Sequence, residues 1–322
     1  MALKSITISA RITLNLHNMN NEGSEGNHQQ TRMVTVATPD GQLHSVNAIS
    51  GDMFKHMIAQ HLQAIAAGRN LPLCEGCKKF NANRIGIDQN FEEFAKEKTK
   101  EDGIEIINEI LNKCAIDDIL GIMFTGQGEG SGKHSIARKS VIETGWIVGI
   151  PEQVRTESFL HVKYVPERGK GKGESSNVGQ NLFHRPTNSG VYALVINIDF
   201  DRIGFNDITR TYPVEIKDRK ERALALLDAV IVAIVKLTGA QRGTQLPHIT
   251  SFDGIIATSQ STIPAPSFSP LSDNFKEEIK KIGGNLNKIE KDKIKTRPAE
   301  SLDAAVDILI DLRDQFSAGE RE

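Results

Sequence analysis

The residues with the clearest chemical potential are two cysteines at metal-ligand spacing. Cys74 and Cys77 form a Cys-x-x-Cys pair, a spacing typical of zinc sites, which need two further ligands. The candidates for those ligands are His56 and His61 on the preceding predicted helix and the one remaining cysteine, Cys114. The alternative is two free cysteines in a loop. The sequence is therefore compatible with a structural zinc ion, and it indicates no other cofactor.

A glycine-rich stretch suggests a nucleotide site but lacks the required pattern. Residues 126–133 read Gly-Gln-Gly-Glu-Gly-Ser-Gly-Lys, and Lys133 is followed by His134. A phosphate-binding P-loop needs a glycine where Gln127 stands and a serine or threonine where His134 stands, and no Gly-x-Gly-x-x-Gly is present. The stretch is therefore predicted to be a flexible loop rather than an NTPase site.

Acidic residues give no positive sign of catalysis. Asp117 and Asp118 lie in an apolar context, which favours a helix cap over an acid–base pair. There is no nucleophile elbow and no His-Glu-x-x-His motif. We therefore expect a protein that is not an enzyme.

Basic residues are concentrated in one part of the chain. Residues 133–185 hold nine Lys and Arg against five Asp and Glu, a net +4, and the rest of the chain carries −6 of the total −2. They occupy glycine-rich or polar loops beside histidines and Phe183. Such loops can follow a phosphate backbone, while an aromatic ring can stack on a base. Charge alone leaves an ordinary solvated loop as an equal alternative.

Composition limits the class of protein. The 322 residues allow about two domains or one domain with insertions. No apolar run approaches the roughly 18 residues of a membrane helix, and the N-terminus lacks a signal-peptide pattern. Three cysteines suit a reducing compartment. A cytoplasmic protein without a membrane partner is the expectation, and the near-neutral charge argues against unspecific coating of duplex DNA.

Hydrophobic periodicity then predicts the elements that position these residues. Strands are expected at 5–16, 31–37, 43–46, 140–150, 158–165, 190–200 and 248–258, and polar loops at 18–30 and 168–188. Helices are expected at 50–68, 91–98, 104–113, 219–238, 273–281 and 301–316, the last two after a Pro-rich linker. The order indicates an α+β sheet domain interrupted by insertions.

Three segments together resemble a known family. They are residues 8–27, which begin Ile-Ser-Ala-Arg-Ile-Thr-Leu-Asn; residues 47–56, Asn-Ala-Ile-Ser-Gly-Asp-Met-Phe-Lys-His; and residues 190–194, Gly-Val-Tyr-Ala-Leu. Residues 114–121 and 137–140 also fit. The chain resembles the DevR-like backbone subunits of type I CRISPR effector (Cascade) complexes, most of all the I-B branch, over most of residues 5–260.

The resemblance implies a modified RRM-like (ferredoxin-like) palm, a helical finger insertion and a β-hairpin thumb. The palm would comprise 1–58 and 136–260 with the thumb at 161–188, the finger 59–135, and the linker and C-terminal helices 261–322. It also implies copies lining up along a guide RNA (crRNA), the target DNA strand bound through the guide, and other Cascade subunits as partners. Base sequence would not be read, because a guide carrier must accept any spacer.

The same resemblance implies the RNA-binding residues. They are Arg11 and Asn21 in the first strand and its loop, Ser50, Lys55 and His56 at the start of a helix, Arg138 and Lys139 in a basic segment, and Lys170, Lys172, Phe183 and Arg185 in the thumb. The alternatives are a solvent-facing Arg11 and a packing role for His56.

Two rival functions remain open at this stage. Type III relatives cut RNA with an aspartate in the loop after the first strand, but residues 18–30 contain Glu22 and Glu25 and no Asp. The second rival is a DNA-binding autoregulator, which the absence of a helix-turn-helix pattern disfavours.

Overall fold

Strand β1 (Ser5–His17) organises a large, mostly antiparallel sheet in the computed structural model, which describes residues 3–98, 102–127, 133–164 and 180–318. Its residues alternate, so Ile6, Ile8 and Ile12 face a buried core. It pairs with β10 (Gln180–Asp199) on one side and with β11 (His248–Ser259) on the other. Mixed α/β structure around such a sheet confirms the predicted α+β class.

The remaining strands extend this sheet on both sides. The order is β12-β11-β1-β10-β9-β5-β4, with β12 at Ile294–Ala299, β9 at Ile147–Tyr164, β5 at Leu43–Ile49 and β4 at Met33–Ala37. The short β8 (Ile142–Thr144) also pairs with β10. Beyond the main core, β9 and β10 continue as a long hairpin.

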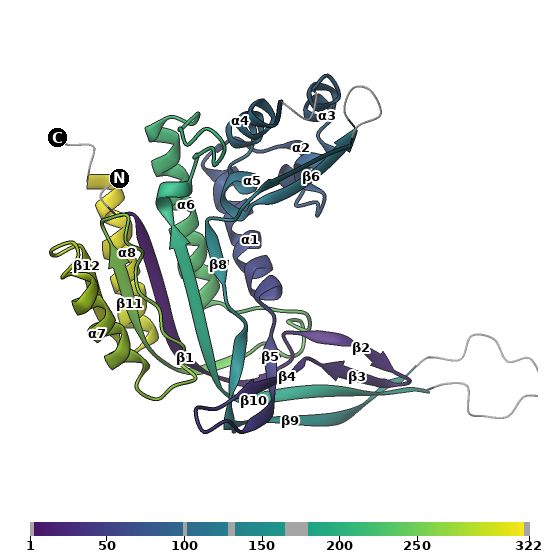
Figure 1. The fold of residues 1–322 in the computed structure, drawn as a ribbon. Helices are drawn as coiled ribbons and strands as arrows, with labels where there is room; N and C mark the ends of the chain where they lie inside the picture. The colour runs from purple at the N-terminus through teal and green to yellow at the C-terminus, as the bar shows by residue number, and fades with distance from the viewer. Residues whose placement is uncertain (1–2, 99–101, 128–132, 165–179, 319–322) are drawn as a thin grey trace, which may run out of the picture.

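Three helices cover the core face of the sheet (Figure 1). They are α1 (Gly51–Gly68), α6 (Ile216–Val235) and α8 (Leu302–Ala318), and α6 packs against the other two. Small residues such as Ala225, Ala229 and Ala233 are fully buried along α6. They let the neighbouring helices approach closely while still excluding water.

The opposite face of β11 and β12 is covered by α7 (Phe275–Leu286). Phe275 and Ile279 of this helix form a second, smaller cluster with Ile255 and Ala257 of β11.

The sequence predicted only a linker and helices beyond residue 260, but β12 joins the sheet there. Its polar, Pro-containing sequence carries no strand pattern, because an edge strand is half exposed.

A helical insertion follows α1 and lies at one end of the sheet (Figure 1). It contains α2 (Glu75–Lys78), a 3₁₀ turn (Arg84–Ile87), α3 (Gln89–Lys96), α4 (Gly103–Lys113) and α5 (Ala115–Leu120). A two-stranded ribbon, β6 (Ile122–Gln127) and β7 (Lys133–Arg138), completes it. Phe91 packs edge-on against Phe124, with ring centroids 4.9 Å apart, and ties α3 to the ribbon.

A buried ion cluster joins the insertion to the sheet layer. Asp118 of α5 accepts from Arg138 of β7 and from Arg222 of α6, each at 2.8 Å, and its oxygens also accept from the Gly204 amide. The N-cap position of α5 is Cys114, and Asp117 and Asp118 lie within the helix, so the prediction of a helix cap at these two residues was wrong. Asp118 is fully buried. A buried carboxylate needs such charged partners to offset its desolvation.

The predicted polar loop at 18–30 was also wrong in part, because it contains a hairpin of β2 (Asn21–Glu25) and β3 (His28–Thr31). Most of its residues are exposed, so no alternation of apolar residues indicated it.

The bounds of two predicted strands also differ from the structure. The strand predicted at 158–165 is the second half of β9, and β10 begins ten residues before the strand predicted at 190–200.

A polar network surrounds His17, the last residue of β1. The Asn188 side chain donates to the His17 carbonyl and to the Thr31 hydroxyl, both at 3.2 Å, and Tyr192 donates to Asn47 at 3.0 Å. The ring of His17 is fully buried against Tyr192, and neither ring nitrogen has a hydrogen-bond partner among the described residues. Burial lowers the pKa of His17 to about 4.

Within the described ranges, no helix has the length and apolar character needed to cross a membrane.

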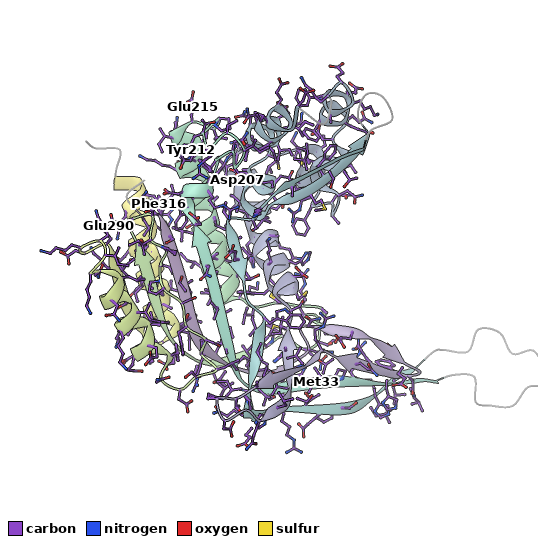
Figure 2. All side chains as sticks on the ribbon, in the orientation of Figure 1. Met33, Asp207, Tyr212, Glu215, Glu290 and Phe316 are labelled. Carbon is purple, nitrogen blue, oxygen red and sulfur yellow. The ribbon has the colours of Figure 1, made fainter. Side chains whose placement is uncertain are left out.

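Replacing Asp118 with asparagine is expected to lower the free energy of unfolding by roughly 3–5 kcal/mol, because two buried guanidinium groups then face a neutral amide. Asp207, labelled in Figure 2, is the matched control. It binds the same Arg138 at 3.1 Å, but its side chain is 45% exposed, so Asp207→Asn should cost less than about 1 kcal/mol. Urea unfolding of both variants measures this, and equal losses would contradict the assignment.

His17 is expected to make stability fall as the solution becomes acidic. Its folded pKa of about 4 lies below the ordinary value of 6.5, so between about pH 6.5 and about pH 4 the unfolded chain takes up the proton and the folded chain largely does not. Between about pH 7.5 and about pH 5 this should remove roughly 2 kcal/mol from the free energy of unfolding. The His17→Phe variant should lose that much less over the same range in urea titrations. Identical pH profiles would show that His17 is not the titrating group.

Candidate nucleic-acid interface

The start of α1 is fixed by its cap and by the strands around it. Ser50 is the N-cap, as predicted, and its hydroxyl accepts from the Met53 amide at 3.2 Å. Its own amide donates to Asn20 at 2.7 Å, which ties α1 to the end of β1. The Gly51 carbonyl accepts from the Thr144 hydroxyl at 3.0 Å. Ser50 is buried, so it shapes the helix start rather than presenting a side chain at the surface.

One face of α1 borders a pocket of about 520 Å³ between the helix and the insertion. Asp52, Lys55, His56 and Ala59 contribute from α1, at the three- and four-residue spacing of one helix face. The opposite wall comes from the insertion and includes Cys77, Phe80, Arg84, Ile116, Leu120, Gly121 and Met123. The structure thus brings Lys55 and His56 together in one site.

Cations outnumber carboxylates in this pocket. Lys55 donates to the Leu120 carbonyl at 2.8 Å, and Arg84 donates to the Gly121 carbonyl at 2.6 Å. Burial lowers the pKa of Lys55, with a smaller contribution from nearby Arg84. An ammonium group has three donors, so Lys55 keeps two beyond the Leu120 contact. Asp52 is the one carboxylate that lines the pocket within the part of the chain described.

The ring of His56 is exposed beside this pocket. Its Nε2 lies 3.1 Å from the Gln60 side chain, and its ring centroid lies 5.4 Å from that of Phe80. Phe80 is 37% exposed. These two rings give the pocket an aromatic rim on which a base could stack.

The long hairpin carries a second group of predicted residues. Phe183 of β10 stacks on His161 of β9 with centroids 5.6 Å apart, and the Arg185 guanidinium lies 4.7 Å from the centroid of the Phe183 ring. Phe183 and Arg185 therefore form one cationic and aromatic patch on one side of the hairpin. Lys170 and Lys172 lie outside the described residues.

Arg11 and Arg138 are corrections to the predicted set. Arg11 points to the sheet face covered by the C-terminal segment, where it binds Asp273 at 2.7 Å and the Pro270 carbonyl at 2.8 Å. Arg138 is buried in the Asp118 cluster, with its side chain 1% exposed. The Arg138 guanidinium is buried with its partners, and that of Arg11 lies over Phe275 of α7, on the face of the sheet away from α1, so we remove both from the candidate RNA contacts.

Asn21 and Lys139 do not line the pocket but lie next to residues that do or that fix the start of α1. Asn21 begins β2, next to the Asn20 contact with the start of α1. Lys139 is exposed, and its backbone lies against Gly121 of the pocket wall, where a Cβ would come within 2.9 Å. Gly121 has φ +71°, and this close approach in the left-handed region requires glycine.

Sequence patterns missed one cation of the pocket, Arg84, and a second, ion-paired cation outside it, Arg32. Arg84 lines the pocket from a 3₁₀ turn in a segment without periodicity. Arg32 binds Glu22 at 2.6 Å and lies 5.4 Å from the ring of Trp146, which is 43% exposed near the start of α1. The only tryptophan of the chain is a signal that could have marked this position.

The predicted Cys-x-x-Cys pair belongs to a larger cluster below the pocket. Cys74 and Cys77 lie with Cys114 and Asp117, and one ligand atom from each lies within 4.8 Å of the others. All four residues are buried, and the cysteines are not in disulfides. Burial raises the pKa of Asp117 to about 8. His56 and His61, which the sequence offered as further ligands, are not members of this cluster.

Comparisons with known proteins agree over most of the chain. Residues 8–280 match the family model described as "CRISPR-associated negative auto-regulator DevR/Csa2". "CRISPR-associated protein Cas7/Csa2 1" of Saccharolobus solfataricus is 24% identical over 89% of this chain and 88% of that protein. "CRISPR-associated protein Cas7/Cst2/DevR" of Methanocaldococcus jannaschii is 26% identical over 86% of this chain and 90% of that protein.

Among solved structures, a chain of a "CRISPR RNA-guided surveillance complex" has a TM-score of 0.49 and 10% identity, over 97% of this chain and 99% of that chain.

Proposed function

The chain belongs to the DevR/Csa2 family of CRISPR-associated proteins, and we propose that it is a crRNA-binding backbone subunit of a type I, Cascade-like effector complex. Copies of the protein would assemble side by side along the guide in the cytoplasm, with other complex subunits at the ends. The guide held in this way would pair with the target DNA strand. The similarity to two CRISPR-associated Cas7 proteins supports this role.

The observation that carries the proposal is the cationic pocket on α1. Lys55 and Arg84 line it from two different parts of the chain; Asp52 is the one carboxylate among the described lining residues, and the buried Asp117 lies 3.9 Å from Arg84. A phosphate group is the ligand that suits two such donors with free N–H groups. Contacts of this kind fix the position of a strand without reading its bases.

The arrangement of the three parts of the molecule also supports the proposal. We propose that the sheet with α1 and α6 is the palm, the helical insertion the finger, and the β9–β10 hairpin the thumb. Figure 1 shows the insertion and the hairpin projecting from the same side of the sheet, above and below the start of α1. A strand of RNA that follows the α1 pocket would therefore run between them.

The hairpin has the surface expected of a contact between copies. Leu160, Val162 and Leu182 are between 46% and 56% exposed and lie on one face of it, whereas the exposed Phe159 lies on the other face, opposite Arg185. Exposed apolar groups in a cluster are typical of interaction surfaces. We propose that the thumb of one copy reaches over its neighbour and covers these residues.

Binding of DNA by the isolated chain, the activity suggested by the word auto-regulator, is less compatible with the fold. Helix α6, the longest among the described residues, has ten buried residues, and its exposed residues, Ile216, Lys217 and Asp218 near its start and Val232 and Val235 near its end, include only one cation, so it lacks the basic face that would enter a DNA groove. We therefore retain RNA as the ligand and use duplex DNA as the comparison in the binding test.

Affinity for single-stranded RNA should fall when exposed cations beside the site are removed. Lys139→Ala and Arg185→Ala should each weaken binding several-fold, equally for two RNAs of unrelated sequence, and reduce the slope of log K against log salt by about 0.7 per lost phosphate contact. Fluorescence anisotropy over a salt series measures both quantities.

Lys280→Ala is the matched control for this experiment, because Lys280 is exposed on α7, on the face of the sheet opposite the core. It should leave RNA affinity unchanged. A loss equal to that of Lys139→Ala, a strong preference for one RNA sequence, or tighter binding to duplex DNA would contradict the proposal.

The protein should bind RNA without cutting it. The segment 18–30 contains no aspartate, and we propose that the subunit has no nuclease activity. Incubation of the assembled complex with Mg²⁺ and labelled RNA complementary to the guide should leave the RNA intact. Regularly spaced, metal-dependent cleavage that disappears in Glu22→Gln or Glu25→Gln would show instead that this chain is the RNA-cutting type of backbone subunit.

A further inference from the structure

Four buried donors, one of which (Cys77) also lines the α1 pocket, form a site that the proposed function does not use. From Cys74, Cys77, Cys114 and Asp117, we propose that the protein binds one structural Zn²⁺ ion, held by three thiolates and one carboxylate. The site lies at the base of the helical insertion. It joins the segment after α1 to the junction of α4 and α5.

The four donors come as two pairs with the same spacing. Cys74 caps α2 and Cys77 lies three residues later, while Cys114 is the N-cap position of α5 and Asp117 lies three residues later. In each pair the first turn of a short helix turns both side chains to the same side. Two such pairs facing each other supply four ligands, the number of a closed, tetrahedral structural zinc site.

The distances suit a shared ion. One ligand atom from each residue lies within 4.8 Å of the others. The Cys74 sulfur is 3.3 Å from an Asp117 oxygen, and the Cys77 sulfur is 3.7 Å from the same oxygen. Ligands at about 2.3 Å for sulfur and about 2.0–2.2 Å for oxygen from one ion are separated by roughly this much.

The loop between the first two cysteines is shaped for ligation. The Cys77 amide donates to the Cys74 sulfur at 3.4 Å, a contact that stabilises the thiolate form. Gly76 lies so close to the 3₁₀ turn that a Cβ there would be 1.9 Å from the Arg84 carbonyl oxygen. The neighbouring backbone therefore holds the Cys-Glu-Gly-Cys turn in place.

Asp117 lacks the close cationic partners that its neighbour Asp118 has. Both Asp117 and Asp118 are fully buried. Asp118 has two guanidinium partners at 2.8 Å, whereas the ion-pair partner of Asp117 among the described residues, Arg84, is 3.9 Å away. The other neighbours of Asp117 in the cluster are thiols, which are weak donors. A metal cation among the thiolates supplies the missing positive charge.

The donor set also selects the metal and its role. Three sulfur ligands favour zinc over magnesium or calcium, which prefer oxygen. All four residues are buried, and four protein ligands leave no position for water or substrate. The ion is therefore structural rather than catalytic. On binding, the thiol protons are released to solvent.

The first test is metal analysis of the full-length protein, purified without a chelator or a His tag from cells grown with added zinc. The expected result is about one zinc per chain, and X-ray absorption should show sulfur at about 2.3 Å and a minority of oxygen ligands. Less than about a tenth of one zinc per chain, a Cys74–Cys77 disulfide in mass spectra, or a shell of nitrogen and oxygen alone would overturn the proposal.

Variants then assign the ligands. Cys74→Ser and Asp117→Asn should lose most of the zinc. The matched control is Asp88→Asn, a buried carboxylate of the same insertion that accepts from the Phe91 and Glu75 amides without belonging to the cluster; it should keep the wild-type zinc content. Wild-type zinc content in both ligand variants would overturn the assignment. Because zinc is measured without RNA, this outcome is independent of the crRNA proposal.

Discussion

The ion cluster around Asp118 is the interaction on which the rest of the structure depends. This one carboxylate binds a guanidinium from the insertion, Arg138, and one from the sheet-covering helix α6, Arg222. All three side chains are buried, and a buried charge without its partner destabilises the fold. Packing of Asp118 therefore requires Arg138 and Arg222 beside it. This buried ion cluster therefore fixes the position of the insertion relative to the sheet. The pocket between α1 and the insertion, which depends on that position, has a defined shape before any ligand binds.

The neighbouring Asp117 extends this constraint to the other side of α5. Its carboxylate points into the cysteine cluster, while Asp118 points to the arginines. If zinc is bound there, the α5 turn is held by a metal on one side and an ion network on the other. Cys77 also lines the α1 pocket, so the metal would support the surface that we assign to RNA. A subunit that must accept many guide sequences benefits from a rigid phosphate site, because positioning rather than base recognition sets its affinity.

Local patterns predicted the elements that have a repeating core face. The predicted bounds of β1, α1 and β11 were close to those in the structure, and Ser50 was identified as a cap. Elements without such a face, β2, β3 and β12, carried no signal. The site was harder to predict, because the surroundings of a side chain depend on residues far along the chain. Arg11 forms an ion pair with Asp273, and Arg138 forms one with Asp118. Both arginines looked like surface cations in sequence. The Cys-x-x-Cys pair was visible, but its partner Asp117 became apparent only when α5 was placed beside α2.

The central claim, that the protein is a guide-RNA carrier, is tested most directly by sequencing the RNA that purifies with it. The protein should be isolated under gentle salt conditions, together with the subunits encoded beside it. The account predicts short RNAs of uniform length that share one flanking sequence and differ in their central part. Co-purification of no RNA, or of fragments of random length and origin, would contradict it.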